Sequence, residues 1–315
     1  MPSRRVFVAG HNGLVGSALV RELKARSYDR LLTRSRSELD LRDQTAVGDF
    51  FRQERPEIVF LAAAKVGGIQ ANNTERWEFL YENLLIQNNI LGNALEHDVK
   101  EVIFFGSSCI YPKLADQPLR EEYLLTGPLE PTNEPYAIAK IAGLKLVEAA
   151  NKEYGYRWLS LMPTNLYGPR DNFDLESSHV LPAMIRKFHE AKDRASRGLG
   201  QPVKLWGTGS ALREFLHVDD LARAACDLMA TGESGLFNVG SGEEVSIRRL
   251  AELVAEVVGY DGAIEWDSTR PDGTPRKLLD SSKVRSTGWT PRIGLAAGLK
   301  QTYEWYLANV GPVNA

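Results

Sequence analysis

The chain has 315 residues, 43% of them hydrophobic and 25% charged, which excludes an intrinsically disordered protein. The formal net charge of −3 excludes the basic surface that non-specific nucleic-acid binding needs, and no apolar run is long enough to span a membrane. Two cysteines, Cys109 and Cys226, cannot form a disulfide framework and favour a reducing compartment. We therefore expect a cytoplasmic protein without a nucleic-acid or membrane partner.

Short apolar runs alternate with longer amphipathic stretches in the first half of the chain. Runs that are apolar throughout are typical of parallel strands buried on both faces. Strands are expected at 5–9, 58–63, 101–105 and 158–162, and two long helices at 77–97 and 136–154. The pattern predicts an α/β fold with a doubly wound parallel sheet of the Rossmann type.

Beyond residue 163 the loops lengthen, and glycine and proline recur in them. Helical patterns remain at 179–192, 219–230, 246–258 and 295–307, and the polar stretch 191–201 is interpreted as a solvated loop. We expect a smaller, mixed α/β region here, over the carboxyl ends of the strands. The predicted division is a nucleotide-binding domain at 1–165 and a substrate-binding region at 166–315, with some of its segments returning to the first domain.

Gly10, Gly13 and Gly16 follow the first expected strand and open a helix. Glycines at this spacing permit a tight turn and let the backbone approach a pyrophosphate, which the helix N-terminus then binds. The motif predicts a dinucleotide cofactor. The alternative is a glycine turn without a ligand.

The second expected strand ends in Thr33-Arg34-Ser35-Arg36-Ser37. NAD-dependent enzymes tend to place an acid here, where it accepts a hydrogen bond from the ribose 2′-hydroxyl, but no acid occurs before Glu38. Two arginines and two serines suit a 2′-phosphate, which favours NADP(H). The alternative is that both arginines are solvated surface residues.

Tyr136 and Lys140 lie four residues apart in the second long helix and so share one face. An adjacent ammonium lowers the pKa of a tyrosine, so the pair can deliver a proton to a carbonyl oxygen while a hydride arrives. Ser107, just after the 101–105 strand, can donate to the same oxygen. A tyrosine–lysine pair alone would be interpreted as surface decoration.

Several segments carry a resemblance to a known family. They are AGHNGLVG at 9–16, AAAKVGGI at 62–69, GSSCIYP at 106–112, EPTNEPY at 130–136 with Lys140, MPTNLYGP at 162–169, REFLHVDD at 213–220 and PDGTPRK at 271–277. On these segments the chain resembles the extended short-chain dehydrogenase/reductases, and within them the GDP-L-fucose synthases (GDP-4-keto-6-deoxy-D-mannose 3,5-epimerase-4-reductases). The resemblance extends over nearly the whole chain, and the GSSCIYP segment is specific to this branch.

The resemblance implies an NADPH-dependent enzyme of nucleotide-sugar biosynthesis that converts GDP-4-keto-6-deoxy-D-mannose to GDP-L-fucose in two steps. C3″ and C5″ are inverted, and the 4-keto group is then reduced. Both carbons flank the ketone, which acidifies their protons, and inversion needs a base and an acid on opposite faces of the ring. The resemblance assigns Cys109 as the base and His179 as the acid; without it, each would be interpreted as structural. His217 and Cys226 are interpreted as structural residues.

Binding residues are also implied by the resemblance. Cofactor contacts are expected from Gly10, His11, Asn12, Gly13, Leu14, Val15, Gly16, Arg36, Asp40, Leu41, Ala63, Phe105, Gly106, Ser107, Ser108, Tyr136, Lys140, Pro163, Thr164, Asn165, Leu166 and His179. The GDP-sugar is expected to contact Lys187, Trp206, Arg213, Asp272 and Lys277, through base stacking, pairing with the pyrophosphate and acceptance from guanine or ribose donors. No metal site is expected, and the two long helices imply a homodimer through a four-helix interface.

Alternatives within the same fold stay open. Asn12 stands where some family members have a basic residue, which leaves Arg36 as the main residue for a 2′-phosphate. A 4-epimerase would need neither Cys109 nor His179, and a 4,6-dehydratase would need acids where Ser108 and Cys109 stand. A non-catalytic NADP-binding regulator typically loses the tyrosine or the lysine, which this chain keeps. A related 6-deoxy or amino sugar is a further possible substrate.

Overall fold

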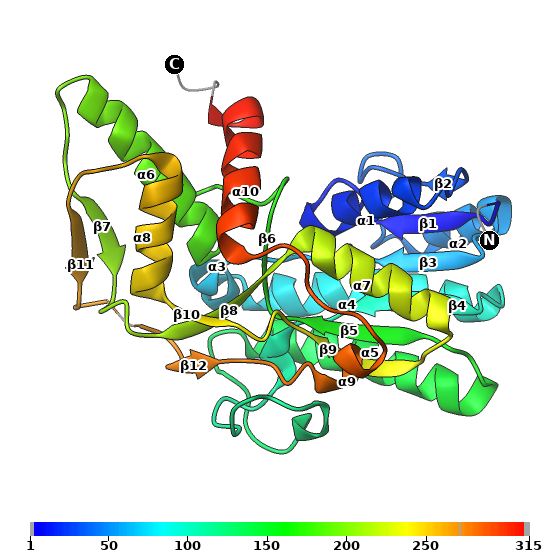
Figure 1. Ribbon diagram of the computed structural model, residues 1–315. Helices are drawn as coiled ribbons and strands as arrows, with labels where there is room; N and C mark the ends of the chain where they lie inside the picture. Colours follow the sequence, from blue (N-terminus) through cyan, green and yellow to red (C-terminus); the bar gives the residue numbers. More distant parts are fainter. Residues whose placement is uncertain (1–2, 271, 312–315) are drawn as a thin grey trace.

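The computed structural model describes residues 3–270 and 272–311. A six-stranded sheet forms the larger lobe (Figure 1), and every neighbouring pair of its strands is parallel. Its order is β2 (Leu31–Leu32), β1 (Val6–Ala9), β3 (Ile58–Leu61), β4 (Glu101–Phe105), β5 (Leu159–Pro163) and β9 (Gly235–Val239). The predicted doubly wound parallel sheet is therefore confirmed.

Alternate residues of each strand enter two separate hydrophobic cores. Val6 and Val8 pack on one face with α1 (Leu14–Ala25) and α7 (Val218–Thr231). On the other face, Phe7 packs with the helices α2, α4 and α5. These helices are α2 (Gln44–Glu54), α4 (Arg76–Glu96) and α5 (Glu134–Tyr154), and the short α3 (Ile69–Thr74) precedes α4. Because successive side chains in a strand point to opposite faces, strands buried on both sides read as unbroken apolar runs.

A smaller lobe is built mainly from the second half of the chain (Figure 1). Its helices are α6 (Val180–Ser196), α8 (Ile247–Val258) and α10 (Leu295–Asn309), which share a third hydrophobic core. Its central strand, β8 (Leu212–His217), pairs with β6 (Asn165–Tyr167), β10 (Glu244–Ser246) and β12 (Arg276–Lys277). A separate pair joins β7 (Val203–Trp206) and β11 (Ile264–Asp267), and α9 (Ser282–Ser286) lies near β9.

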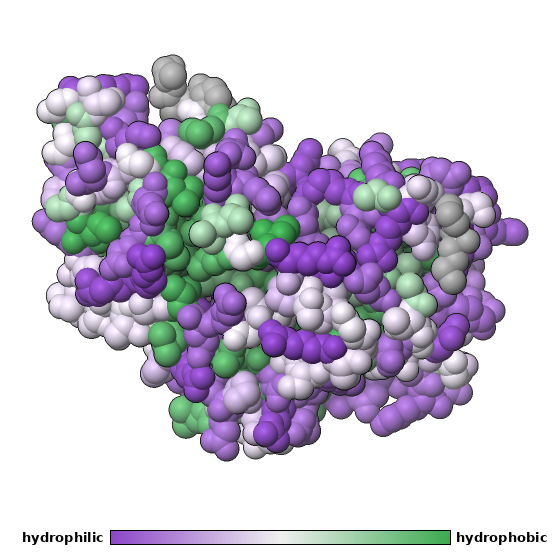
Figure 2. All heavy atoms as spheres, in the orientation of Figure 1, coloured by the Kyte–Doolittle hydropathy of each residue, from purple (hydrophilic) through white to green (hydrophobic). Residues whose placement is uncertain are grey.

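The two lobes are interleaved along the chain. After β8, the chain returns to the large sheet as α7 and β9 before it enters β10 and α8 of the small lobe. On the face drawn in Figure 2, hydrophobic atoms gather beside α8 and the lower end of α10, whereas hydrophilic atoms cover most of the remaining surface. Among the described residues, no helix combines the length and the apolarity that crossing a membrane requires.

One predicted loop is wrong. The stretch 191–201, interpreted as a loop, begins inside α6, which continues to Ser196. Ion pairs one turn apart, Arg194 with Glu190 and Arg197 with Asp193, accompany the extra turn. The polarity of this segment therefore reflects an exposed helix end.

Candidate active site

The glycine turn lies at the carboxyl end of β1, between β2 and β3 in the sheet. Gly10 has a φ of +86°, and a Cβ built on it would lie 2.7 Å from the amide nitrogen of Ala63. A Cβ on Gly16 would lie 2.1 Å from the carbonyl oxygen of Gly10. Gly13 caps α1 without a side chain, which leaves the first N–H groups of this helix, including those of Leu14 and Val15, without a side-chain acceptor. The turn thus forms a backbone cradle of the kind that binds a pyrophosphate.

His11 adds a polar atom to this cradle. Its Nδ1 is buried and has no hydrogen-bond partner among the described residues. An orphaned buried nitrogen is rare in a native fold and calls for a ligand or a water. Together with the close backbone packing that Gly10 and Gly16 permit in the turn, it indicates that the residues fit a dinucleotide.

The arginines after β2 differ in how exposed and how closely paired their side chains are. Arg34 pairs with Glu54 and lies over the Phe50 ring at 5.5 Å, so its guanidinium already has partners within the fold. Arg36 keeps 70% of its side chain exposed and lies 3.9 Å from Glu82. Of the two arginines, only Arg36 is available to an anionic ligand.

Asp40 and Leu41 close the same end of the sheet. The Arg42 guanidinium donates to both carboxylate oxygens of Asp40 and holds the pKa of that carboxyl at about 2. The carbonyl oxygen of Leu41 accepts from Nδ2 of Asn89 at 2.9 Å. Asp40 is therefore an ionised residue with its own arginine partner.

The chain turns sharply after β4, where Ser107 and Cys109 lie. Ser107 is half-buried, and its Oγ accepts from the backbone N–H of Cys109 at 3.4 Å, at the start of a short 3-10 turn that also buries Ser108. Gly106 precedes them, and a Cβ there would collide with Met162 of β5. The strand end and the glycine thus fix the positions of both side chains.

Tyr136 and Lys140 lie one turn apart on α5, as expected. Nζ of Lys140 is buried and donates to the carbonyl oxygen of Phe105 at 2.8 Å, and it lies 5.8 Å from the Tyr136 ring centroid. Burial lowers the pKa of Lys140 to about 8. Tyr136 packs edge-on against Phe79, and burial raises the pKa of its phenol. The expected lowering of the Tyr136 pKa is wrong for this structure, because burial of the phenol, and then the Cys109 charge, raise it.

Cys109 and His179 both carry pKa shifts that favour their neutral forms. Burial raises the pKa of the Cys109 thiol, while the charges of Lys277 and Lys140 oppose that shift. His179 is the N-cap of α6; although the residue is exposed, the protein atoms around its ring and then the Lys277 charge lower the imidazole pKa. The resting site therefore holds one thiol and one neutral imidazole near a shared ammonium.

The strap 163–166 links the two lobes through Glu214. Oγ1 of Thr164 and Nδ2 of Asn165 both donate to the carbonyl oxygen of Glu214, at 3.1 and 2.8 Å. The fully buried Glu214 carboxylate accepts from the backbone N–H groups of Gly242 and Leu279, and its burial raises the pKa. The motifs did not single out Glu214 as a site residue, although an acid directly before the apolar pair Phe215 and Leu216 is a signal for it. Pro163 and Leu166 flank this strap in β5 and β6.

Cationic side chains collect at the small lobe. Lys277 and Arg213 occupy paired positions on β12 and β8, and burial lowers the pKa of each. Lys187 on α6 makes a single long hydrogen bond to the carbonyl oxygen of Lys204, at 3.4 Å. Among the described residues, none of Lys277, Arg213 and Lys187 forms an ion pair, so all three stay available to an anion.

Two further predicted residues border this cationic group. Trp206 is 55% exposed, and the Arg270 guanidinium lies 5.1 Å from its ring centroid. The carboxylate of Asp272 accepts from the backbone N–H and the hydroxyl of Thr208, at 2.7 and 2.8 Å. Asp272 therefore stabilises the 207–210 turn. The sequence predicts only a role in nucleotide binding for this residue and not this structural one. Pro271, in the same motif, lies outside the described residues.

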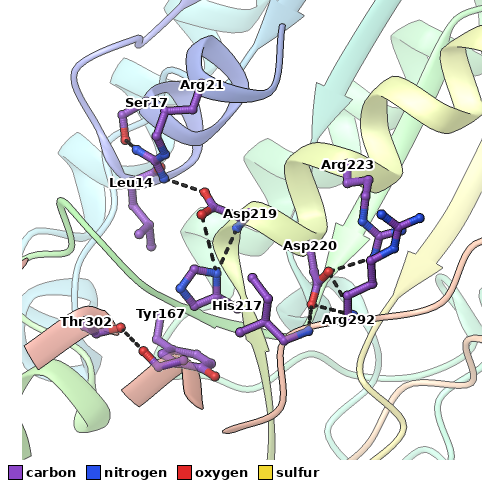
Figure 3. A network of polar contacts seen from close by, with 12 residues as sticks. Leu14, Ser17, Arg21, Tyr167, His217, Asp219, Asp220, Arg223, Arg292 and Thr302 are labelled. Carbon is purple, nitrogen blue, oxygen red and sulfur yellow. Dashed lines mark hydrogen bonds and ion pairs between the residues drawn. The ribbon is translucent and has the colours of Figure 1, made fainter. Parts of the chain in front are cut away.

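His217 connects the lobes from within, as expected of a structural residue (Figure 3). Its ring is fully buried edge-on against Tyr167, and Nδ1 accepts from the backbone N–H of Asp219 at 3.3 Å. Asp219 pairs with Arg21 of α1, and the Tyr167 hydroxyl reaches the carbonyl oxygen of Leu295 on α10 at 3.5 Å. This chain of contacts therefore runs from α1 in the large lobe to α10 in the small lobe. Cys226, also interpreted as structural, is fully buried in the core beside α1.

Comparisons with known proteins agree with this geometry. The model of the NAD dependent epimerase/dehydratase family matches residues 6–240, which run from β1 to just past β9. The chain belongs to this family. This epimerase/dehydratase is 58% identical over 310 residues to GDP-L-fucose synthase 1 of Arabidopsis thaliana, covering 98% of this chain and 94% of that protein. It is 51% identical to the GDP-L-fucose synthase of Escherichia coli, with 98% of each covered.

The fold also matches a solved structure over nearly the whole chain. The GDP-mannoheptose C4 reductase of Campylobacter jejuni, with NADP bound, matches with a TM-score of 0.88 and 39% identity over 98% of this chain and 99% of that one. The epimerase/dehydratase match ends before Asp272 and Lys277, but the two fucose synthases cover nearly the whole chain. The cationic group of the small lobe thus lies within the region shared with these relatives.

Proposed function

We propose that this chain is a GDP-L-fucose synthase, which epimerises GDP-4-keto-6-deoxy-D-mannose at C3″ and C5″ and then reduces C4″ with NADPH. The observation that carries the proposal is the buried thiol of Cys109, two residues from Ser107 and within the electrostatic influence of Lys140 and Lys277. A plain reductase has no use for such a group. The 58% and 51% identities to named GDP-L-fucose synthases support the same substrate.

The reduction half is assigned to Tyr136, Lys140 and Ser107. NADPH, when bound, supplies the hydride to C4″. Tyr136 donates a proton to the 4-keto oxygen, and Ser107 donates a hydrogen bond to it. Lys140, fixed to the Phe105 carbonyl, stabilises the phenolate that remains.

The epimerisation half is assigned to Cys109 as base and His179 as acid. The pair carries one proton in total, and the reacting form holds it on His179, as thiolate and imidazolium. Both inverted carbons flank the ketone, so removal of either proton gives an enolate whose charge lies on the 4-keto oxygen. The donors on Tyr136 and Ser107 stabilise that oxygen as well. His179, next to the cationic Lys277, returns a proton to the opposite face of the ring.

Cofactor binding is assigned to the glycine turn and to the ends of the large sheet. The backbone around Gly10, Gly13 and Gly16 holds the pyrophosphate, and Arg36 pairs with the 2′-phosphate of NADP(H). The exposed guanidinium of Arg36 supports this assignment. The remaining contacts are assigned to His11, Asn12, Leu14, Val15, Asp40, Leu41, Ala63, Phe105, Gly106, Ser107, Ser108, Tyr136, Lys140, Pro163, Thr164, Asn165, Leu166 and His179.

GDP binding is assigned to the small lobe, which holds most of the proposed 166–315 region apart from α7 and β9, which return to the large sheet; 1–165 is assigned most of the cofactor contacts. Lys187, Arg213 and Lys277 pair with the pyrophosphate, Trp206 stacks on the base, and Asp272 orders its turn and accepts from the nucleotide. Three cations without an ion pair among the described residues, and one exposed tryptophan in the same lobe, support an anionic aromatic ligand.

A homodimer is proposed through α4 and α5. Trp77 and Tyr81 on α4 and Ile138 and Leu146 on α5 are exposed at 70%, 48%, 44% and 42%, on two helices that pack against each other. An exposed apolar face of this kind marks an interface. A cytoplasmic location is also proposed, supported by two buried cysteines that form no disulfide.

The deciding experiment adds GDP-4-keto-6-deoxy-D-mannose and NADPH to the protein in deuterated water. We expect NADPH oxidation, deuterium at C3″ and C5″, and GDP-L-fucose as the product identified by NMR. Oxidation without ring deuterium would instead identify a simple 4-reductase. The Campylobacter jejuni reductase match favours that second candidate, which would leave Cys109 and His179 structural. No oxidation would reject both.

A further inference from the structure

Glu38 lies in the turn that follows β2. The strand order places β2 beside β1, so the turn after β2 borders the glycine turn. In dinucleotide-binding folds, the residues at this place contact the adenosine ribose and decide between a 2′-hydroxyl and a 2′-phosphate. Hydrogen bonds from the backbone and side chain of Ser35 lower the pKa of Glu38, and the Arg34 and His11 charges lower it further. Glu38 is therefore an anion within the electrostatic influence of the cradle.

This carboxylate takes the donors that the turn offers. One oxygen of Glu38 accepts from the backbone N–H of Ser35 at 2.7 Å and from its Oγ, also at 2.7 Å. The Ser35 hydroxyl also lies 3.0 Å from that of Ser37. The sequence predicts a phosphate contact for the serines of this turn. In the structure, Ser35 already donates to the Glu38 carboxylate, which belongs to the same turn.

The positive charge available to balance a phosphate is small. Arg34 is bound to Glu54, and Arg42 is bound to Asp40. Position 12 holds a neutral asparagine. Of the basic residues at the end of β2, Arg36 alone has an exposed side chain.

We propose that Glu38 determines cofactor specificity, because it holds the Ser35 donors and repels the 2′-phosphate. As a result, the preference for NADPH over NADH is weaker than it would be with Arg36 alone. The inference rests on the proposed use of NADP(H) at this site. A carboxylate repels a phosphate dianion, whereas it accepts a hydrogen bond from an unphosphorylated 2′-hydroxyl. Glu38 is thus a specificity residue that acts on the 2′ position of the ribose.

The test measures binding of two fragments, 2′,5′-ADP and 5′-ADP, by calorimetry on the wild type and on Glu38→Gln. Glutamine keeps an oxygen that accepts from Ser35 but removes the charge. We expect Glu38→Gln to bind 2′,5′-ADP about three- to tenfold more tightly, with 5′-ADP unchanged or weaker. The gain should shrink at high salt, since it is a charge effect at an exposed site.

Glu304→Gln is the matched control, because it removes an exposed charge from α10 in the other lobe. It should change neither affinity. Equal affinities for the wild type and Glu38→Gln, or a parallel change for both fragments, would overturn the inference and leave Glu38 as a structural cap of its turn. If the wild type binds neither fragment and neither NADPH nor NADH, the proposed cofactor itself fails, and the inference fails with it.

Discussion

Tyr136 and Cys109 lie at one site but are assigned to different halves of the reaction. Tyr136→Phe keeps the ring against Phe79 and removes only the proton donor. We expect it to slow NADPH oxidation by about 10²–10⁴-fold, while deuterium still enters at C3″ and C5″, more slowly, because Ser107 remains as a donor to the enolate oxygen. Cys109→Ser should abolish deuterium uptake at those carbons. Both rates can be followed by NMR and absorbance in deuterated water. Loss of exchange in Tyr136→Phe would contradict the separation of the two halves.

The pH dependence of ring-proton exchange follows from the neutral Cys109 and His179. Exchange needs one proton shared by the pair: below the lowered His179 pKa both groups are protonated, and above the raised Cys109 pKa both are deprotonated. Because the two pKa values are shifted apart, kcat/KM for exchange should rise with pH only below 6.5, stay level, and fall only above 9.0. A narrow maximum near pH 7.5 would show that the two pKa values lie close together.

The positions of the proposed catalytic side chains could be predicted from the sequence because short spacings carry them: Tyr136 and Lys140 share a helix, and Ser107 and Cys109 share a turn. Contacts between residues far apart in the sequence could not be predicted in this way. Glu214, for example, binds the N–H of Leu279, and no local pattern indicates that contact. The pKa of Tyr136 was also beyond prediction, because it depends on how deeply the fold buries the phenol.

At the scale of single elements, the glycines of α1 and α2 predict opposite effects of the same substitution. Gly16→Ala puts a Cβ 2.1 Å from the Gly10 carbonyl oxygen, so it should destabilise the protein by about 2 kcal/mol or more and abolish NADPH binding. Gly48→Ala, in the interior of α2, meets its nearest neighbour at 3.6 Å and should stabilise by about 0.5–1 kcal/mol. Denaturant unfolding and dinucleotide titration check both, and a destabilised Gly48→Ala with an unaffected Gly16→Ala would contradict the geometry.

The long elements were predictable because their apolar pattern repeats many times. The helices expected at 77–97 and 136–154 lie within a few residues of α4 and α5. The strands of the small lobe were missed, since they are two to six residues long and several are exposed on one face. In β7, buried and exposed residues do alternate, but four residues are too few to distinguish a strand from a turn.

At the scale of the whole molecule, the exposed face of α4 and α5 predicts the oligomeric state. The wild type should have a mass twice the 35.1 kDa of the chain. Leu146→Glu should shift the equilibrium toward the monomer, because the dimer would bury a carboxylate of each protomer against the apolar surface of the other. Leu199→Glu, which makes the same change at a leucine 66% exposed after the end of α6, should stay dimeric. Light scattering measures all three, and a wild-type monomer would reject the interface.

The return of the chain from the small lobe to β9 has a consequence for synthesis on the ribosome. The edge of β5 pairs with β9, so it stays uncovered until residue 239 has left the exit tunnel. By then the nascent chain already holds β8 and α7 but lacks α8 and α10. A gene fragment that ends at residue 165 would encode an open, apolar sheet edge, which is prone to aggregation. Exchanging the small lobe between relatives therefore requires splicing at several points in the gene.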